Sequence, residues 1–337
     1  MSLEDIGHGF PRFFKTPTPH TPMKWFLAAC SILLLPLCPR ASAWSAPGHM
    51  IVTSLAYDQL TEAERMKFDA ILRSHAKYAT WKKTYPAAGL PGVPLEKFIA
   101  MLASLYPDDI RNHANPETFP EWHYIDYPLL PPDFPLKPAP TPGDDVITGI
   151  AKSSKAVKGL TKTFDARTRA KMLSFLLHLV GDIHQPMHCE TLFDDKFPEP
   201  EGDRGGNNAW VKPPDGSAIK LHAFWDQLFG TSGQLFHPVP VTTVLAAEHR
   251  ANELAPKFPR SALPELTRHT TPLGWSHESR ALAISDGWRR HTLAYGLTEA
   301  TAAPLPADYG EKAHAIAERQ VALAGHRLAD HLHEVLK

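Results

Sequence analysis

The stretch Phe175–His188, FLLHLVGDIHQPMH, decides the fold because it combines an apolar helix with ionisable side chains. Apolar residues fill helical positions over Arg167–Ile183, and Pro186 then ends the helix, since proline has no amide hydrogen to donate. His178 and Asp182 are four residues apart, so they share one face of this helix. The pattern predicts a central buried helix that carries a histidine and a carboxylate into the interior.

A carboxylate inside an apolar helix needs a partner, because an unpaired buried charge is costly. One interpretation is a hydrogen-bonded histidine–aspartate pair in the core. The segment KLHAFWDQLFG repeats the spacing with His222 and Asp226, and His188 follows the helix-ending proline, whereas His184 is expected to face elsewhere. Zinc takes imidazole nitrogen and carboxylate oxygen at about 2.0–2.2 Å. The doubled pattern therefore favours a metal site.

Two upstream segments contain further candidate side chains. YPDDIRNHA has Asp108 and, three residues later, Arg111, a pair suited to a metal ligand and a phosphate clamp. EWHYIDYP has His123 and Asp126, with Tyr124 between them. Taken singly, a surface salt bridge would account for the first pair and a half-buried loop histidine for the second.

The composition predicts a globular protein. Of 337 residues, 43% are hydrophobic and 21% charged, enough for a large core. The net charge of -1 argues against a broad basic face for nucleic acid, so a polyanionic substrate would need local positive charge such as metal ions. The 19 histidines are consistent with metal binding.

The N-terminal region, residues 1–43, is typical of a secretory signal peptide. Lys24 precedes the apolar run Trp25–Cys38, and Ala-Ser-Ala stands directly before Trp44; the run is too short to span a membrane comfortably. We expect translation to start at Met23 and cleavage to follow Ala43. The protein would then be secreted or periplasmic, without a membrane anchor.

Cysteine usage favours a bacterial exported protein. Cys30 and Cys38 lie in the signal region and leave only Cys189, so the mature chain can have no internal disulfide. Leu27–Cys30 resembles a lipidation box, but almost no apolar sequence precedes it. No Asn-x-Ser/Thr site occurs either. A large core or bound metal must therefore stabilise the fold.

The rest of the chain is mostly of helical pattern. Thr61–Glu64 is a capping box that opens a helix toward Ser74. The Pro-Pro-Asp-Gly turn within Trp210–Leu221 predicts a small β-hairpin. The loops over 131–143 and 191–206 are too short to separate domains, so we expect one mainly α-helical domain over 44–337. Further helices are predicted over 95–105, 144–160, 221–229, 241–254, 276–295 and 309–335.

The order of these motifs resembles the zinc-dependent S1/P1 nuclease family, which has a mainly α-helical fold, shared with the phospholipase C family, and three zinc ions. The mature chain of that family begins with tryptophan, as Trp44 would here. The matching order is Trp44 with His49, PDDIR, HYID, HxxxDxHQPxH, GGNN, LHxxWD and AGHRLADHL, which covers nearly all of the mature chain.

The resemblance assigns the zinc ligands position by position. Asp182 would bridge the first and third ions, and the third would also take the backbone amine and carbonyl of Trp44 with His49. The remaining ligands are Asp108, His123 and His178 for the first ion, and His188, His222 and Asp226 for the second. The activity implied is hydrolysis of single-stranded DNA and RNA to 5′-phosphorylated products, with 3′-nucleotidase activity, by a monomer without a stable protein partner.

The resemblance also implies roles around the metals. Arg111 would stabilise charge on the phosphoryl oxygens, and Asp126 would orient or deprotonate the attacking water. Tyr124 would stack on a base or merely line the zinc pocket. Asn207, in Gly205–Asn208, would make a polar contact or belong to a plain loop. Gln227 stands where several members have asparagine, which puts a base contact there in doubt.

Two alternatives stay open. The zinc-dependent phospholipase C family shares the fold and the three-zinc plan, but has glutamate at the position of Asp226 and a longer step from tryptophan to the first histidine. The step from Trp44 to His49 and the HYID segment favour the nuclease. A non-catalytic zinc-binding protein would need neither Arg111 nor Asp126 beside the metals.

Overall fold

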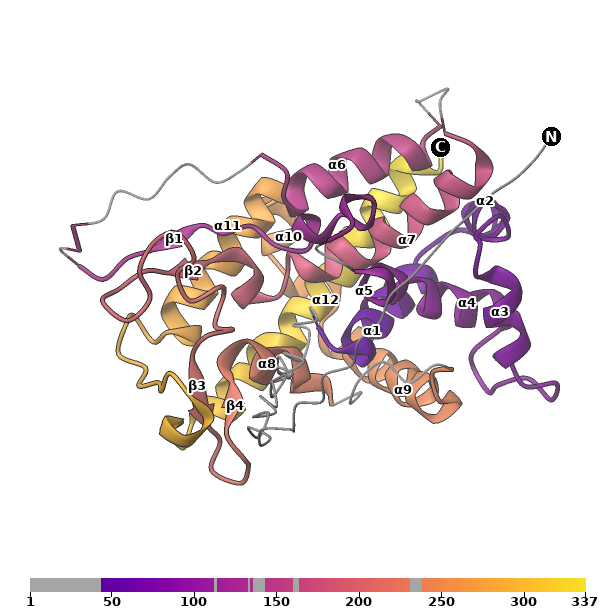
Figure 1. Ribbon diagram of the computed structural model, residues 1–337. Helices are drawn as coiled ribbons and strands as arrows, with labels where there is room; N and C mark the ends of the chain where they lie inside the picture. Colours follow the sequence, from indigo (N-terminus) through magenta and orange to yellow (C-terminus); the bar gives the residue numbers. More distant parts are fainter. Residues whose placement is uncertain (1–43, 112–113, 133, 136–142, 160–163, 231–237) are drawn as a thin grey trace, which may run out of the picture. The chain divides into compact units, whose positions relative to one another are not determined.

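Helix α7 (Ala166–Asp182) runs through the middle of the fold in the computed structural model, with α6 (Val146–Val157) and α12 (Tyr309–Val335) packed against it (Figure 1). The side chain of Asp165 caps α7 by accepting from the Thr168 amide at 2.7 Å. Every residue from Met172 to Asp182 is buried. The predicted central helix is confirmed, and Pro186 begins a 3-10 turn (Pro186–Cys189) after it.

The structure describes residues 44–337 except 112–113, 133, 136–142, 160–163 and 231–237. These described residues all belong to one compact unit, Ala41–Lys337. The predicted signal region and most of the predicted proline-rich loop lie outside the described residues. None of the described helices has the length and apolar character needed to cross a membrane.

The mainly helical fold class is confirmed, because the described strands are only two or three residues long. Besides α6, α7 and α12, the α-helices are α1 (Ala46–Asp58), α2 (Glu62–Leu72), α3 (Tyr78–Thr84), α4 (Leu95–Ala103), α5 (Tyr106–Ile110), α8 (Leu221–Asp226), α9 (Val241–Lys257), α10 (Glu265–Arg268) and α11 (Pro272–Leu282). The strands are β1 (Pro128–Leu129), β2 (Thr191–Leu192), β3 (Trp210–Lys212), β4 (Ile219–Lys220) and β5 (Ala303–Pro304).

The strands form two small sheets. β3 and β4 pair antiparallel with Val211 opposite Ile219, which confirms the predicted hairpin, and β5 adds a parallel third strand. β1 and β2 pair in parallel, with Pro128 opposite Thr191. Strands of two residues carry no alternating pattern, so neither β5 nor the β1–β2 pair could be predicted.

Two predicted helices end earlier than expected. The helix predicted over 95–105 ends at Ala103, and Pro107 lies in the first turn of the separate helix α5, where a missing amide is tolerated. The helix predicted over 276–295 stops as α11 at Leu282, continues as a π-helical turn (Ala283–Gly287), and then reverses. Arg289, Arg290 and His291 follow in left-handed conformation, with φ of 46°, 54° and 65°.

Two apolar clusters make up most of the core. The larger joins α1, α4, α6, α7, α9 and α12 and includes Leu177, Val180 and Cys189. The smaller surrounds β3 and α8 and includes Met187 and Trp225. The histidines and aspartates singled out from α7, the following turn and α8 are sequence neighbours of these residues. The candidate site is therefore flanked along the chain by residues of both clusters.

Candidate metal centre

Three groups of buried side chains place histidine nitrogens and carboxylate oxygens within 4.8 Å of one another. They come from six segments: α1, α5, the turn Pro120–His123, α7, the turn Pro186–Cys189 and α8. The groups are His49, His178 and Asp182; Asp108, His123 and His178; and His188, His222 and Asp226. The structure thus brings together the eight histidines and aspartates that the resemblance assigned to the metals, and Trp44 belongs to none of these groups. The role of these residues as zinc ligands stays a prediction.

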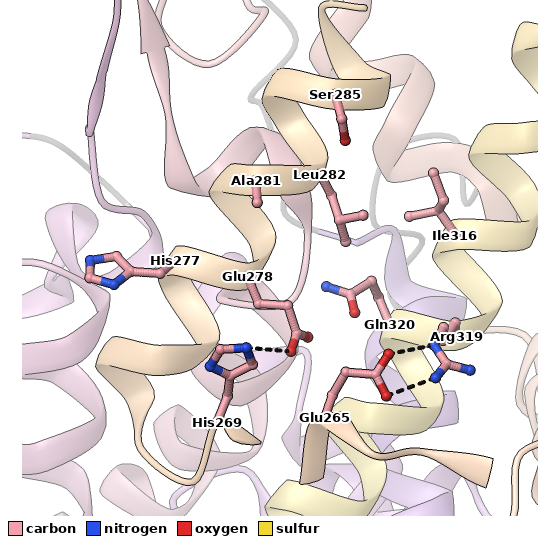
Figure 2. A pocket seen from close by; sticks show the side chains of 10 residues that line it. All are labelled: Glu265, His269, His277, Glu278, Ala281, Leu282, Ser285, Ile316, Arg319 and Gln320. Atoms are coloured by element: carbon pink, nitrogen blue, oxygen red, sulfur yellow. Dashed lines mark hydrogen bonds and ion pairs between the residues drawn. The ribbon is translucent and has the colours of Figure 1, made fainter. Parts of the chain in front are cut away.

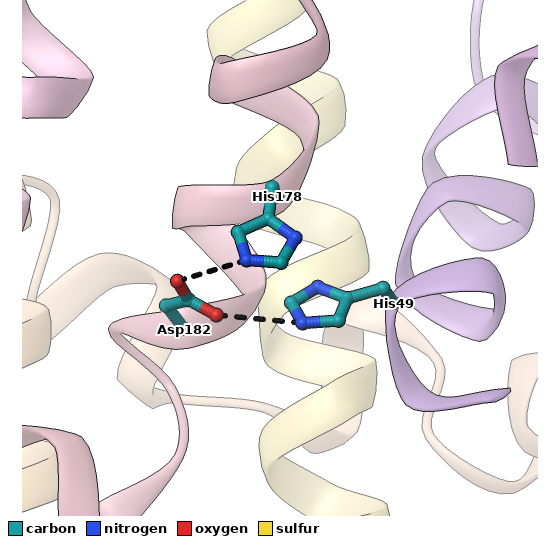
Figure 3. A group of neighbouring side chains, drawn as sticks. All are labelled: His49, His178 and Asp182. Atoms are coloured by element: carbon teal, nitrogen blue, oxygen red, sulfur yellow. Dashed lines mark ion pairs between the residues drawn. The ribbon is translucent and has the colours of Figure 1, made fainter. Parts of the chain in front are cut away.

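Asp182 stands at the centre of the first two groups. Its Oδ1 lies 3.4 Å from His49 Nε2, and its Oδ2 lies 3.2 Å from His178 Nε2 and 3.1 Å from His123 Nδ1. Figure 3 shows α1 and α7 presenting His49 and His178 to opposite oxygens of this carboxylate. A carboxylate with different histidines at its two oxygens can ligate two cations at once.

Backbone hydrogen bonds orient three of the histidines. The Nδ1–H groups of His178, His188 and His222 donate to the carbonyl oxygens of Ser104, His123 and Gly205 at 2.7, 2.6 and 2.6 Å. Each ring then presents an Nε2 lone pair to its group. Metal-ligating histidines almost always donate their other nitrogen in this way.

The facing ring nitrogens indicate a cation. His188 Nε2 and His222 Nε2 are 3.1 Å apart, and both would be lone pairs in the tautomers just described. His49 is fully buried and stacks on His178 with ring centroids 3.9 Å apart. Within the described residues, neither His49 ring nitrogen has a hydrogen-bond partner. Buried polar atoms without partners are costly, so this donor set fits a metal ion.

The charges of the first two groups also favour metal. Burial lowers the pKa of His49 to about 3 and that of His123 to about 4, so both rings are neutral and able to ligate. Burial also opposes a proton on His178, but Asp182 and Asp108 outweigh it and raise its pKa to about 10. The two buried carboxylates, Asp108 and Asp182, therefore stabilise positive charge between them. A divalent cation would supply this charge in place of the proton on His178.

The start of the described chain lies beside the group of His188, His222 and Asp226. Trp44 is fully buried, and its ring meets Phe229 edge-to-face at 5.6 Å. The amide of Ser45 donates to the carbonyl oxygen of Asp226 at 2.9 Å. The position of Trp44 is therefore fixed by contacts next to a candidate ligand.

Arg111 and Tyr124 lie together. Arg111 is buried at the C-terminal end of α5, and its guanidinium carbon lies 5.8 Å from the centroid of the Tyr124 ring. The ring of Tyr124 is half-buried, and its hydroxyl donates to the carboxylate of Glu121. The planar guanidinium fork of Arg111 has the geometry that suits paired hydrogen bonds to phosphate oxygens.

Asp126 and Asn207 keep different contacts. Asp126 retains solvent access, and its Oδ1 accepts from Thr191 Oγ1 at 2.7 Å. The Asn207 amide donates to the carbonyl oxygen of Arg204 at 2.9 Å, which favours a role in shaping its own loop. Gly205 has φ of 62°, and an added Cβ would lie 2.4 Å from the carbonyl oxygen of Met187, so only glycine fits there.

Sequence reasoning missed two positioning side chains. Gln185 Nε2 donates to Asp226 Oδ1 at 2.7 Å while its Oε1 accepts from the Met187 amide at 2.6 Å, so it orients that carboxylate. Thr191 Oγ1 donates to Asp126 Oδ1 and orients that carboxylate in the same way. The position of Gln185 between His184 and His188 in the sequence could have indicated its role. His184 faces away, as expected, and its Nε2 lies 2.7 Å from Arg327.

A separate cavity of about 570 Å³ lies between α10, α11 and α12 (Figure 2). Its lining contains none of the candidate metal ligands. Glu265 pairs with Arg319 at 2.7 Å, and Glu278 pairs with Arg327 at 3.0 Å. Arginine side chains therefore already neutralise these two carboxylates.

Gly181 permits the close approach of α1 to α7, and its replacement by alanine is expected to disturb one metal group selectively. An added Cβ would lie 2.8 Å from His49 Nδ1, so the ring must turn away from Asp182. We expect a loss of about 1–3 kcal/mol of stability and a metal affinity about 10–100-fold weaker at this group. Unfolding curves and metal titration of the purified protein measure both effects.

Gly325→Ala is the matched control, because its Cβ would meet Leu55 of the same helix α1 at 2.6 Å, away from the metal groups. It should lower stability without changing metal content. In a His49→Ala background, Gly181→Ala should cost less stability than in the unmodified protein. Full metal content in Gly181→Ala, or equal costs in both backgrounds, would contradict the steric argument.

Comparison with known proteins gives matches along most of this chain. A family model described as S1/P1 Nuclease matches residues 44–337. Endonuclease 4 of Arabidopsis thaliana is 24% identical over 323 residues, a match that spans 93% of this chain and 95% of that protein. Both matches extend over all the groups described above.

Proposed function

The chain belongs to the S1/P1 nuclease family, whose members are metal-dependent, and from this premise we propose that it is an exported three-zinc phosphodiesterase. Its substrates would be single-stranded DNA and RNA, cleaved to 5′-phosphorylated products, and 3′-nucleotides. The similarity to an endonuclease supports nuclease activity in general. The observation that carries the finer proposal is the set of buried histidine–carboxylate groups joined through Asp182.

The residues that would hold zinc follow from these groups. Asp108, His123 and His178 would bind one ion, and His188, His222 and Asp226 another. Asp182 and His49 would bind the third ion together with the amine and carbonyl of Trp44, once cleavage after Ala43 has freed that amine. The donors are imidazole and carboxylate without thiolate, a set that zinc accepts.

Zinc bound here supplies Lewis acidity and a hydrolytic water that ionises near neutral pH. The side chains of this chain do the rest. Arg111 would bind the non-bridging phosphoryl oxygens and stabilise the charge that develops on them. Asp126 would accept a hydrogen bond or a proton from the attacking water, with its carboxylate held by Thr191.

We propose that Tyr124 gives the protein its preference for single strands. A base stacked on an aromatic ring gains about 1–3 kcal/mol, and a duplex hides that face of the base. The Tyr124 ring is half-buried and rests against Arg111, so base and scissile phosphate would be held by adjacent side chains. In the alternative, Tyr124 only lines the pocket.

Metal removal tests the proposal directly. The purified mature protein should hydrolyse single-stranded DNA, RNA and 3′-nucleotides, and should lose activity at least 100-fold after exhaustive chelation, because the metals supply several kilocalories per mole of transition-state stabilisation. Added zinc should restore it. Duplex DNA of the same sequence and phosphatidylcholine serve as comparison substrates.

Full activity after zinc removal would refute the metal mechanism. Hydrolysis of phosphatidylcholine without hydrolysis of nucleic acid would instead support the phospholipase C alternative. Zinc binding without hydrolysis of any of these substrates would support a non-catalytic role. Intact mass of the exported protein checks the proposed cleavage after Ala43, and sedimentation checks the proposed monomer.

A further inference from the structure

Arg204 lies in a loop that is held rigidly next to the metal centre. Its φ is 58°, a left-handed conformation that non-glycine residues seldom adopt. The preceding residue, Asp203, is fully buried and accepts hydrogen bonds from the amides of Leu192 and Gly206. The Asp203 amide donates in turn to the Leu192 carbonyl oxygen at 2.9 Å. These contacts impose the unusual backbone on Arg204.

The same loop is tied to a candidate metal ligand. The carbonyl oxygen of Gly205 accepts from His222 Nδ1 at 2.6 Å, and that of Gly206 accepts from the His222 amide at 3.2 Å. Asn207 fixes the Arg204 carbonyl oxygen from the other side, through its amide side chain at 2.9 Å. Arg204 is therefore placed at a set position relative to the metal group of His222.

The Arg204 side chain is exposed, and among the described residues it forms no ion pair. Its charge nevertheless acts on Asp126: burial raises the pKa of that carboxyl group, and Arg204 works in the opposite direction. Arg111, by contrast, is buried and acts on His123, His188 and His222 inside the centre. The Arg111 guanidinium therefore lies inside the site, and the Arg204 guanidinium lies at its edge.

We propose that Arg204 binds a phosphate of the polynucleotide other than the one being cleaved. This inference rests on the proposed function. It identifies Arg204 as the residue with which the protein would distinguish a polynucleotide strand from a mononucleotide. A guanidinium without a carboxylate partner binds phosphate oxygens through paired hydrogen bonds. Because the chain has a net charge of -1, each such local cation matters for a polyanion.

The test compares a single-stranded oligonucleotide with a 3′-nucleotide, using the zinc-loaded protein. Arg204→Gln should raise KM for the oligonucleotide about tenfold at low salt, since one charge-assisted hydrogen-bonded contact is lost. KM for the 3′-nucleotide should change less than twofold, because that substrate has no second phosphate. The slope of log KM against log salt for the oligonucleotide should become shallower by about 0.7.

Three further variants make the test specific. Arg204→Lys should restore most of the affinity and the salt slope, because it keeps the charge. Arg204→Gly relieves the left-handed strain and should behave like Arg204→Gln, which separates charge from loop conformation. Arg167→Gln removes an exposed arginine in the first turn of α7, at the end opposite Asp182, and should change nothing.

Each outcome decides one proposal. If the unmodified protein hydrolyses neither substrate, the proposed function fails before any variant is compared. If it hydrolyses both, an unchanged oligonucleotide KM and salt slope in Arg204→Gln overturn the role of Arg204. An equal loss on both substrates also overturns it, because Arg204 would then act at the scissile phosphate.

Discussion

Asp182→Asn is expected to release metal from two groups at once and to lower kcat/KM by about 1,000-fold, equivalent to about 4 kcal/mol of transition-state stabilisation. The reason is the position of the carboxylate, whose two oxygens face His49 on one side and His123 with His178 on the other. An amide keeps the shape but loses the charge and one acceptor oxygen.

Metal content and activity must be measured on the same preparation. The control is Asp165→Asn at the other end of α7, where Asp165 caps the helix through Thr168. Asparagine caps as well as aspartate, so this variant makes the same chemical change in the same helix without touching the metals. An Asp182→Asn protein that still holds three zinc ions at native affinity would contradict the bridging role.

Retention of a single residue before Trp44 is expected to remove one zinc ion and to lower kcat/KM by about 100-fold or more. An amine at the chain end is a ligand, whereas an amide nitrogen in a peptide bond has no available lone pair. Trp44 cannot move aside to compensate, because its side chain is fully buried against Phe229 and the neighbouring Ser45 amide is bonded to Asp226. Export and activation would then depend on the same cleavage.

The experiment compares chains that begin at Ala43 and at Trp44, released from the same fusion protein. A chain that begins at Trp44 and carries one extra residue after Lys337 controls for added length. Intact mass verifies each terminus, and metal analysis counts the bound ions. Normal zinc content and activity in the chain that begins at Ala43 would show that the amine of Trp44 is not a ligand.

Local patterns predicted the parts of the site that lie on single elements. His178 and Asp182, and likewise His222 and Asp226, are four residues apart, and a helical repeat of 3.6 places each pair on one face. The bounds of α12 were predicted to the residue, since apolar periodicity persists along its length. The left-handed turn at residues 289–291 was not predicted, because none of these three residues is a glycine or an asparagine, the types that most often adopt this conformation.

The order of motifs along the chain was enough to indicate the family, and the helical repeat was enough to pair neighbouring ligands. Only the tertiary structure decided that His49 meets Asp182, that Gln185 orients Asp226, and that Arg204 lies at the edge of the centre. The first two contacts join residues 133 and 41 positions apart. Such contacts depend on how closely whole helices pack, as Gly181 shows for α1 and α7, and a local repeat holds no information about that distance.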